Sequence, residues 1–287
     1  MERKPEWLKV KLPGSGEFSD VKSIIRHYHL HTVCEEARCP NIGECWGSGT
    51  ATFMILGDTC TRSCKFCATR TGNPHGFLEE DEPQRVAMAV REMELDYVVL
   101  TSVNRDDLED GGANHFARTI REIRKSAPDA IIEVLIPDYV DDGLRVVVEA
   151  GPDVLGHNIE TVRRLTPIVR DKRFSYDKSL KVLKQAKKFD PEIYTKSSIM
   201  LGLGETEEEV IEAMRDLREI DVDFFTLGQY LRPTPRHFPV KRFVSPDEFR
   251  RFEEIGLALG FRYVASGPLV RSSYKAAEFF IKSVVRG

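Results

Sequence analysis

The chain lacks long apolar runs, strong net charge and low-complexity tracts. None of its 287 residues belongs to an apolar run near the roughly eighteen residues that a membrane-spanning helix needs. A net charge of -4 and a pI near 6.0 give no general reason to expect nucleic acid or an anionic membrane surface as a partner. The first residues show no signal or transit segment, so we expect a cytoplasmic protein whose thiols stay reduced.

Cysteine is also scarce, and neither group of cysteines completes a four-ligand site. The six residues form two triplets with the spacings C-x4-C-x5-C and C-x3-C-x2-C: Cys34, Cys39 and Cys45, then Cys60, Cys64 and Cys67. Structural zinc usually takes four protein ligands, whereas an iron-sulfur cubane held by three thiolates keeps one iron open for chemistry. The spacing therefore predicts two iron-sulfur clusters, with a zinc knuckle or a pair of disulfides as the alternatives.

Short apolar runs alternate with helical patterns through most of the chain, and 41% hydrophobic residues supply a substantial core. We expect six strands, at residues 51–58, 96–103, 130–136, 154–159, 194–201 and 224–231. Helical patterns lie between them at 83–93, 114–126, 175–189 and 206–219. Repeated βα units predict an α/β fold with a parallel sheet, curled into a partial (β/α)6 barrel. Cys60 follows the first strand, which puts its loop on the face where barrels carry active sites.

The βα alternation also divides the chain. Residues 1–49 lack it and are predicted to be an N-terminal extension that carries the first cysteine triplet. Residues 50–245 form the predicted barrel. Residues 246–287 are predicted to be a C-terminal extension, with a helix at 246–259, a short strand at 261–265 and the sequence Arg271-Ser-Ser-Tyr274.

The second triplet, Cys60-Thr-Arg-Ser-Cys64-Lys-Phe-Cys67, resembles the signature of the radical S-adenosylmethionine (SAM) enzymes, with the aromatic Phe66 before the last cysteine. The resemblance implies a 4Fe-4S cluster whose open iron binds the amino and carboxylate groups of SAM. Reductive cleavage of SAM then gives a 5'-deoxyadenosyl radical. A half-open barrel of this type leaves room for a bulky macromolecular substrate.

The first triplet, Cys34-Glu-Glu-Ala-Arg-Cys39-Pro-Asn-Ile-Gly-Glu-Cys45-Trp, and Arg271-Ser-Ser-Tyr274 resemble the defining motifs of the lipoyl synthase family. Segments 104–112, 157–161, 201–205 and 228–234 resemble that family too. The resemblance implies an auxiliary 4Fe-4S cluster held by the first triplet and Ser273, with Ser272 not excluded, that is sacrificed as a sulfur donor. A serine pair standing alone is more typical of helix capping or phosphate binding.

The resemblance implies insertion of two sulfur atoms at C6 and C8 of an octanoyl chain on a lysine of a carrier protein. The implied partners are an octanoylated lipoyl carrier domain or protein, a low-potential electron donor and an iron-sulfur carrier that rebuilds the auxiliary cluster. Unactivated C–H bonds are beyond any side-chain base at neutral pH, so a radical is chemically required. The alternatives are another radical SAM enzyme with an auxiliary cluster, and a non-catalytic iron-sulfur or zinc protein.

Candidate contacts to SAM lie at the ends of the predicted strands. The end of the second predicted strand and the loop after it carry hydroxyl, amide and carboxylate side chains that suit the polar groups of SAM: Thr101, Ser102, Asn104 and Asp106. Many members of the lipoyl synthase family have Asp where this chain has Asn104. Gly202, Gly204 and Glu205 resemble a strand end near the adenine. Thr206 and Glu209, however, also predict a capping box for the helix that follows, and in that case the two glycines only form the turn before the helix.

Further polar residues end the fourth and sixth strands. His157, Asn158 and Glu160 are predicted to contact SAM or substrate, or else to form a hydrogen-bonded network between strand and loop. Arg232 is predicted to orient the substrate amide or the SAM carboxylate, with a surface ion pair as the alternative. The lysines at 178, 181, 184 and 188 mark one helix face, which suits an acidic carrier but is more typical of a solvated face.

Overall fold

One eight-stranded sheet organises the chain. The computed structural model describes residues 5–9, 16–273 and 283–285. The strand order is β1-β2-β5-β6-β7-β8-β9-β10, and every neighbouring pair is parallel except β1 with β2. The strands are β1 (His31–Thr32), β2 (Thr52–Ile55), β5 (Tyr97–Ser102), β6 (Ile131–Leu135), β7 (Val154–Gly156), β8 (Tyr194–Leu201), β9 (Phe224–Gln229) and β10 (Tyr263–Gly267). Within the described residues β1 and β10 do not pair, so the barrel is open.

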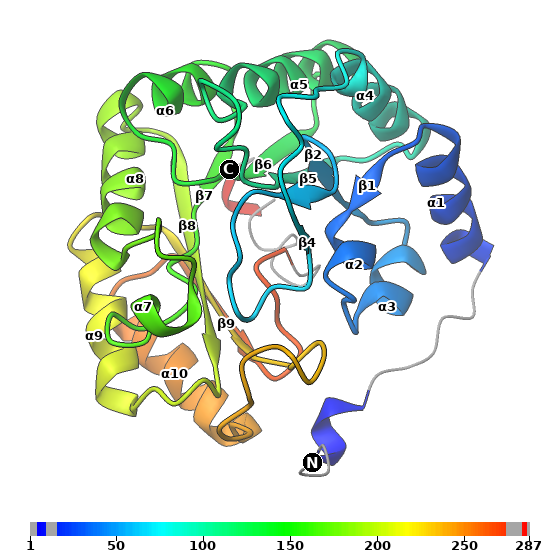
Figure 1. The fold of residues 1–287 in the computed structure, drawn as a ribbon. Helices are drawn as coiled ribbons and strands as arrows, with labels where there is room; N and C mark the ends of the chain where they lie inside the picture. The colour runs from blue at the N-terminus through cyan, green and yellow to red at the C-terminus, as the bar shows by residue number, and fades with distance from the viewer. Residues whose placement is uncertain (1–4, 10–15, 274–282, 286–287) are drawn as a thin grey trace.

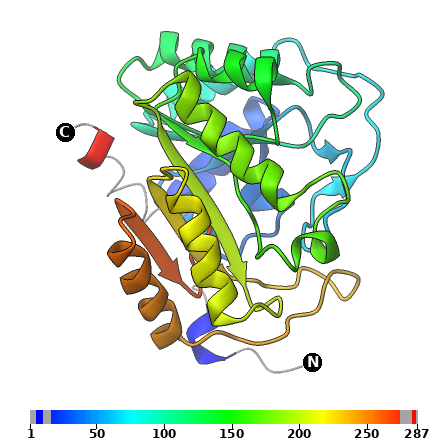
Figure 2. The same ribbon diagram turned by 90° about the vertical axis from the view of Figure 1, so that its left-hand side faces the viewer.

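Helices cover the outer face of the sheet. Figure 1 shows them as an arc around the strands, and Figure 2 shows three of them side by side over the later strands. The arc consists of α4 (Glu82–Glu92), α5 (Ala113–Ser126), α6 (Asp141–Val148), α8 (Tyr176–Phe189), α9 (Glu207–Arg218) and α10 (Pro246–Ala258). Near the N-terminus lie η1 (Glu6–Leu8), α1 (Gly16–His27), α2 (Val33–Glu36) and α3 (Ile42–Trp46); α7 (Thr166–Val169) precedes α8. A small pair, β3 (Thr59–Cys60) and β4 (Arg70–Thr71), brackets the second cysteine triplet.

The predicted α/β fold with a partial barrel is confirmed. All six expected strands are present as β2 and β5 to β9, and the four expected helices are α4, α5, α8 and α9. The capping box at Thr206 and Glu209 is also present. The Thr206 side chain accepts a hydrogen bond from the Glu209 backbone N–H, and the Glu209 side chain accepts one from the Thr206 backbone N–H. The short strand expected near 261–265 is β10, which pairs with β9 and extends the same sheet.

The two faces of the sheet bury different side chains because successive residues of a strand point to opposite faces. Val98 and Leu100 of β5 belong to the large apolar cluster that includes the helices, whereas Tyr97 and Val99 belong to a second, smaller cluster. Beside Tyr97 lies a buried ion pair in which Lys196 Nζ lies 2.8 and 2.9 Å from the carboxylate oxygens of Glu133. Both side chains are at most 4% exposed. Tyr97 donates a hydrogen bond to the same carboxylate.

We predict that Lys196→Met destabilises the fold by about 3–5 kcal/mol, because it leaves Glu133 charged and buried without its partner. Chemical denaturation measures the change. Lys125→Met is the matched control, since the Lys125 side chain is 70% exposed in its pair with Glu122, and we expect a change below about 1 kcal/mol there. Equal losses in the two variants would contradict the assignment.

Candidate active site

A cavity of about 510 Å³ opens at the carboxyl ends of the strands. It is lined by all six cysteines together with Ser272 and Ser273. The two triplets are therefore neighbours in space, although one lies between β1 and β2 in the sequence and the other begins in β3. Such a shared cavity allows two metal clusters and one substrate to meet.

Backbone amides point at the sulfurs of the second triplet. Cys60 Sγ accepts from the N–H groups of Arg62 and Asn104, each at 3.4 Å, and Cys64 Sγ accepts from the N–H of Asp171 at 3.3 Å. Donors aimed at sulfur favour the thiolate form, which is the form that ligates metal. This loop fits a bound iron-sulfur cluster.

Burial acts in the opposite direction on the unligated thiols. It raises the pKa of Cys64 to about 12 and that of Cys34 to about 11, so neither is a thiolate unless positive charge is bound beside it. None of the six cysteines forms a disulfide. Within the described part of the chain no three His, Cys, Asp or Glu side chains are grouped to hold one metal ion.

A segment from the N-terminal part of the chain and one from the C-terminal part meet at the first triplet. Asn41, between Cys39 and Cys45, donates from Nδ2 to the carbonyl oxygen of Leu269 at 2.7 Å. This bond fixes the segment that leads to Ser272 and Ser273 beside the triplet. Tyr274 of the predicted motif lies outside the described residues.

Seven of the eleven predicted SAM or substrate contacts line the cavity. They are Thr101, Ser102, Asn104, His157, Asn158, Glu160 and Arg232. The other four, Asp106, Gly202, Gly204 and Glu205, are not among its lining residues. The lining residues come from the ends of different strands, as expected for the active face of a barrel.

Several of these side chains already have protein partners. His157 places Nδ1 3.0 Å from the Ile136 carbonyl oxygen and Nε2 3.1 Å from Ser179 Oγ, and burial lowers its pKa to about 4. The imidazole is therefore neutral. Its two nitrogens take part in a hydrogen-bonded network, which was the alternative prediction for this residue. Arg232 donates to the carbonyl oxygens of His237 (2.8 Å) and Pro235, so it orders its own loop.

Glu160 differs because its carboxylate faces the cavity with few partners. Asn158 Nδ2 donates to it at 3.2 Å, and burial raises its pKa. Glu205, by contrast, accepts from the backbone N–H groups of Gly202, Leu203 and Gly204 at 2.6 to 3.0 Å. That carboxylate shapes the turn before α9, a role that was predicted as the alternative for Gly202 and Gly204 but not for Glu205.

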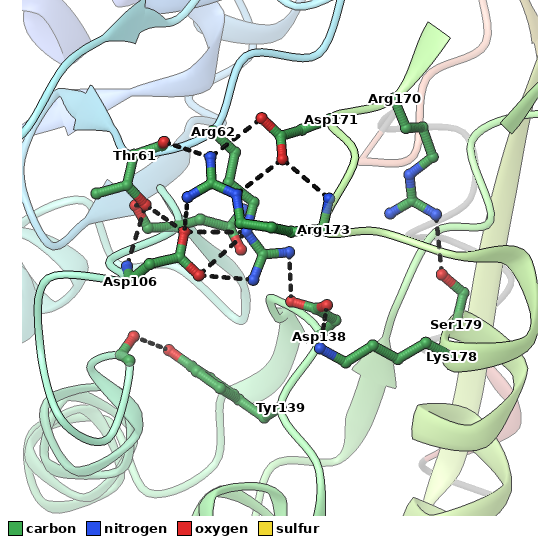
Figure 3. Close-up of polar contacts among 12 residues, drawn as sticks. Thr61, Arg62, Asp106, Asp138, Tyr139, Arg170, Asp171, Arg173, Lys178 and Ser179 are labelled. Carbon is green, nitrogen blue, oxygen red and sulfur yellow. Dashed lines mark hydrogen bonds and ion pairs between the residues drawn. The ribbon is translucent and has the colours of Figure 1, made fainter. Parts of the chain in front are cut away.

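The sequence reasoning missed a charged network beside the second triplet (Figure 3). Arg62 and Arg170 each place the guanidinium carbon 4.2 Å from the ring centroid of Phe174. Arg62 Nη1 lies 2.7 Å from Asp138 Oδ1, whose second oxygen lies 2.6 Å from Lys178 Nζ. The sequence feature that could have indicated this network is the charged run Arg170-Asp-Lys-Arg-Phe174, but one sequence alone does not distinguish such a run from an ordinary surface loop.

Lys178, predicted to face solvent or an acidic carrier, is therefore paired within the chain. Lys181 Nζ also lies 3.7 Å from Asp141 Oδ2. Two of the four lysines of this stripe thus have intramolecular partners.

The open parallel sheet and the cysteine loop at its carboxyl edge define a radical SAM enzyme. Residues 54–217, more than half of the chain, match the family model of the radical SAM superfamily. Residues 1–39 match the N-terminal domain of lipoyl synthase of that family. The chain belongs to the lipoyl synthase family.

Full-length relatives carry that assignment. The chain is 58% identical over 285 residues to the lipoyl synthase of Thermus thermophilus, covering 99% of this chain and 88% of the relative. It is 54% identical to the lipoyl synthase of Sorangium cellulosum, covering 98% and 80%.

Solved structures support the fold alone. The FeFe-hydrogenase maturase HydG superposes with a TM-score of 0.59 at 14% identity, over 93% of this chain and 66% of that one. Methylornithine synthase superposes with a TM-score of 0.52 at 15% identity, over 91% and 86%.

Gly228 of β9 allows the C-terminal segment to approach the cavity. A Cβ at this position would lie 2.1 Å from the Val270 carbonyl oxygen, closer than any real contact. We predict that Gly228→Ala displaces residues 268–273 and speeds their backbone hydrogen exchange roughly tenfold.

Gly143→Ala is the control for this variant. Gly143 lies in α6, and its Cβ would meet Ala113 Cβ of α5 at 3.7 Å, an ordinary contact. Exchange of residues 268–273 should be unchanged there. Unchanged exchange in Gly228→Ala as well would contradict the close approach.

Proposed function

We propose that this lipoyl synthase family enzyme binds two 4Fe-4S clusters in its cavity, a SAM-binding cluster on Cys60, Cys64 and Cys67 and an auxiliary cluster on the first triplet and Ser273. The observation that carries the proposal is the single cavity lined by both triplets and by Ser272 and Ser273. Each triplet lacks a fourth thiolate. The second keeps an iron open for SAM, and the first takes its fourth ligand from the C-terminal segment.

Serine oxygen is a harder donor than a thiolate and a weaker partner for cluster iron. An auxiliary cluster with such a ligand suits a group that is dismantled to release sulfur. Ser273 and Ser272 both line the cavity, and we assign the ligand role to Ser273.

The substrate proposed is an octanoyl chain on a lysine of a lipoyl carrier domain, which gains sulfur at C6 and C8. SAM bound at the open iron supplies the radical that removes hydrogen from these unactivated carbons. The protein holds the octanoyl carbons between the two cysteine triplets and excludes water and other hydrogen donors. Apolar lining residues such as Met200 and Leu135 suit an alkyl chain.

Polar residues of the lining are the proposed SAM contacts. Thr101, Ser102 and Asn104 adjoin the Cys60 loop, and Thr61 N–H donates to the Asn104 carbonyl oxygen at 2.9 Å. Glu160 is proposed to accept a hydrogen bond from SAM, because it lines the cavity and accepts a side-chain hydrogen bond from Asn158. Asp106 and Glu205 are proposed to act on the surrounding loops instead.

The reaction also requires partners. A low-potential electron donor must reduce the SAM-binding cluster, and an iron-sulfur carrier must rebuild the auxiliary cluster after each turnover. We propose that the enzyme works in the cytoplasm, where reducing conditions keep cluster cysteines from cross-linking. Within the described residues no helix is long and apolar enough to cross a membrane.

The proposal is tested with protein reconstituted anaerobically with iron and sulfide. SAM, a low-potential reductant and an octanoyl-lysine peptide are added, and the peptide is followed by mass spectrometry. We expect a gain of two sulfurs, with loss of two hydrogens once the product dithiol is oxidised to the disulfide after the reaction, together with 5'-deoxyadenosine. Formation of 5'-deoxyadenosine with an unmodified peptide would retain the radical chemistry and reject the substrate.

Cysteine variants separate the two sites. We predict that Cys34→Ala still cleaves SAM but inserts no sulfur, because it removes a ligand of the auxiliary cluster only. Cys60→Ala should abolish both activities. Parallel assays of 5'-deoxyadenosine and thiolated peptide give the comparison, and equal loss of SAM cleavage in both variants would argue against two separate clusters.

A further inference from the structure

We propose that Arg173 and Asp171 are positioning residues that clamp the Cys60–Cys64 loop between two neighbouring loops and so aim backbone donors at the cluster sulfurs. The inference rests on the proposed cluster at Cys60, Cys64 and Cys67. Neither residue lines the cavity in which SAM and the octanoyl chain are proposed to bind. Their effect must pass through the loop that holds the cluster.

Arg173 joins three segments of the chain (Figure 3). Its Nη2 donates to the Thr61 carbonyl oxygen in the cysteine loop at 2.7 Å. Its Nη1 donates to Asp106, after β5, at 3.0 Å. Its Nε and Nη2 donate to Asp171 at 2.8 and 3.0 Å. One planar guanidinium thus makes four contacts in different directions, which a lysine ammonium on a flexible stem does not reproduce.

Asp171 carries the clamp to the middle of the cysteine loop. Its Oδ2 accepts from the backbone N–H of Ser63 at 3.0 Å and from Ser63 Oγ at 3.3 Å. Its own backbone N–H donates to Cys64 Sγ at 3.3 Å. The hydrogen bonds from Arg173 hold the pKa of this carboxyl well below its usual range, so it is ionised at neutral pH.

Asp106 forms the opposite side of the clamp. It accepts from Thr61 Oγ1 at 2.6 Å and from Arg62 Nη2 at 2.8 Å. The adjacent Asn104 N–H donates to Cys60 Sγ at 3.4 Å. The two loops that Arg173 joins therefore each supply one N–H group to a cluster cysteine.

Hydrogen bonds to cluster sulfurs stabilise the more negative, reduced state and so raise the reduction potential. They also favour the thiolates over loss of the metal. Loosening the clamp should therefore make the SAM-binding cluster harder to reduce and easier to strip with a chelator. A role confined to general stability would change neither property selectively.

The test compares Arg173→Ala and Arg173→Lys with Arg163→Ala in chains loaded with clusters. Arg163 is a matched control, since it also pairs with two carboxylates, Asp177 and Asp216, and its side chain is 49% exposed against 40% for Arg173. Among the residues that the structure describes, no hydrogen bond or ion pair joins Arg163 to the cysteine loop. The two readouts are the rate of iron release to a chelator and the midpoint potential followed by electron paramagnetic resonance.

We expect both Arg173 variants to release iron about three- to tenfold faster, the factor that the loss of one hydrogen bond gives. Their SAM-cluster potential should move to more negative values. Arg163→Ala should match the wild type in both readouts. For Asp171→Asn, the iron-release rate and the potential should lie between those of the wild type and of the Arg173 variants. Its amide oxygen still accepts a hydrogen bond from Ser63, whereas the ion pair with Arg173 is lost.

Arg173 variants that match Arg163→Ala in both readouts would overturn the positioning role and leave the proposed function intact. Wild-type chain that takes up no cluster on Cys60, Cys64 and Cys67 would overturn the proposed function, and the clamp with it. Faster iron release at an unchanged potential would overturn the claim that the clamp aims the sulfur donors. The readouts thus separate the two failures.

Discussion

The active cavity depends on a contact between an N-terminal and a C-terminal segment of the chain at the carboxyl edge of the parallel sheet. The hydrogen bond from Asn41 to the Leu269 carbonyl oxygen joins positions 228 residues apart. Gly228 permits this arrangement because no side chain stands between β9 and Val270. Without this contact, three cysteines and two serines would belong to separate surface segments rather than to one cavity.

Charge around the cysteine loop is balanced by pairing. Arg62 and Arg170 flank Phe174, and Asp138 lies between Arg62 and Lys178. The side chains of Asp138 and Arg62 are at most 8% exposed, and each has a second oppositely charged partner, Lys178 for Asp138 and Asp106 for Arg62. Such a network holds a loop rigidly, and rigid loops are what a site for radical chemistry requires.

The sequence contains most of the fold because its signals are local. Strand runs, helical periodicity and the capping box at Thr206 depend on residues a few positions apart, and all appear in the structure. Cysteine spacing is equally local, and it identified both triplets as candidate ligands of metal clusters. What local signals do not show is the joining of the triplets in one cavity, which depends on packing across the whole chain.

Side-chain partners were predicted less well for the same reason. Asp106 and Glu205 are polar residues at strand ends, yet one pairs with arginines and the other binds backbone N–H groups. His157 likewise completes a buried network through Ser179. Asn41 gave no sign of its contact with Leu269, because a bond across 228 residues leaves no pattern in the sequence around either end.

One measurement tests most directly whether the two triplets work as a pair. The chain is reconstituted with heavy-isotope sulfide, freed of unbound sulfide, given light sulfide in solution, and allowed a single turnover on an octanoyl-lysine peptide. The account predicts that both sulfur atoms in the product are heavy, because they come from the cluster on Cys34, Cys39 and Cys45. Product that carries light sulfur from sulfide added afterwards would contradict it, since the first triplet would then not hold the sulfur donor.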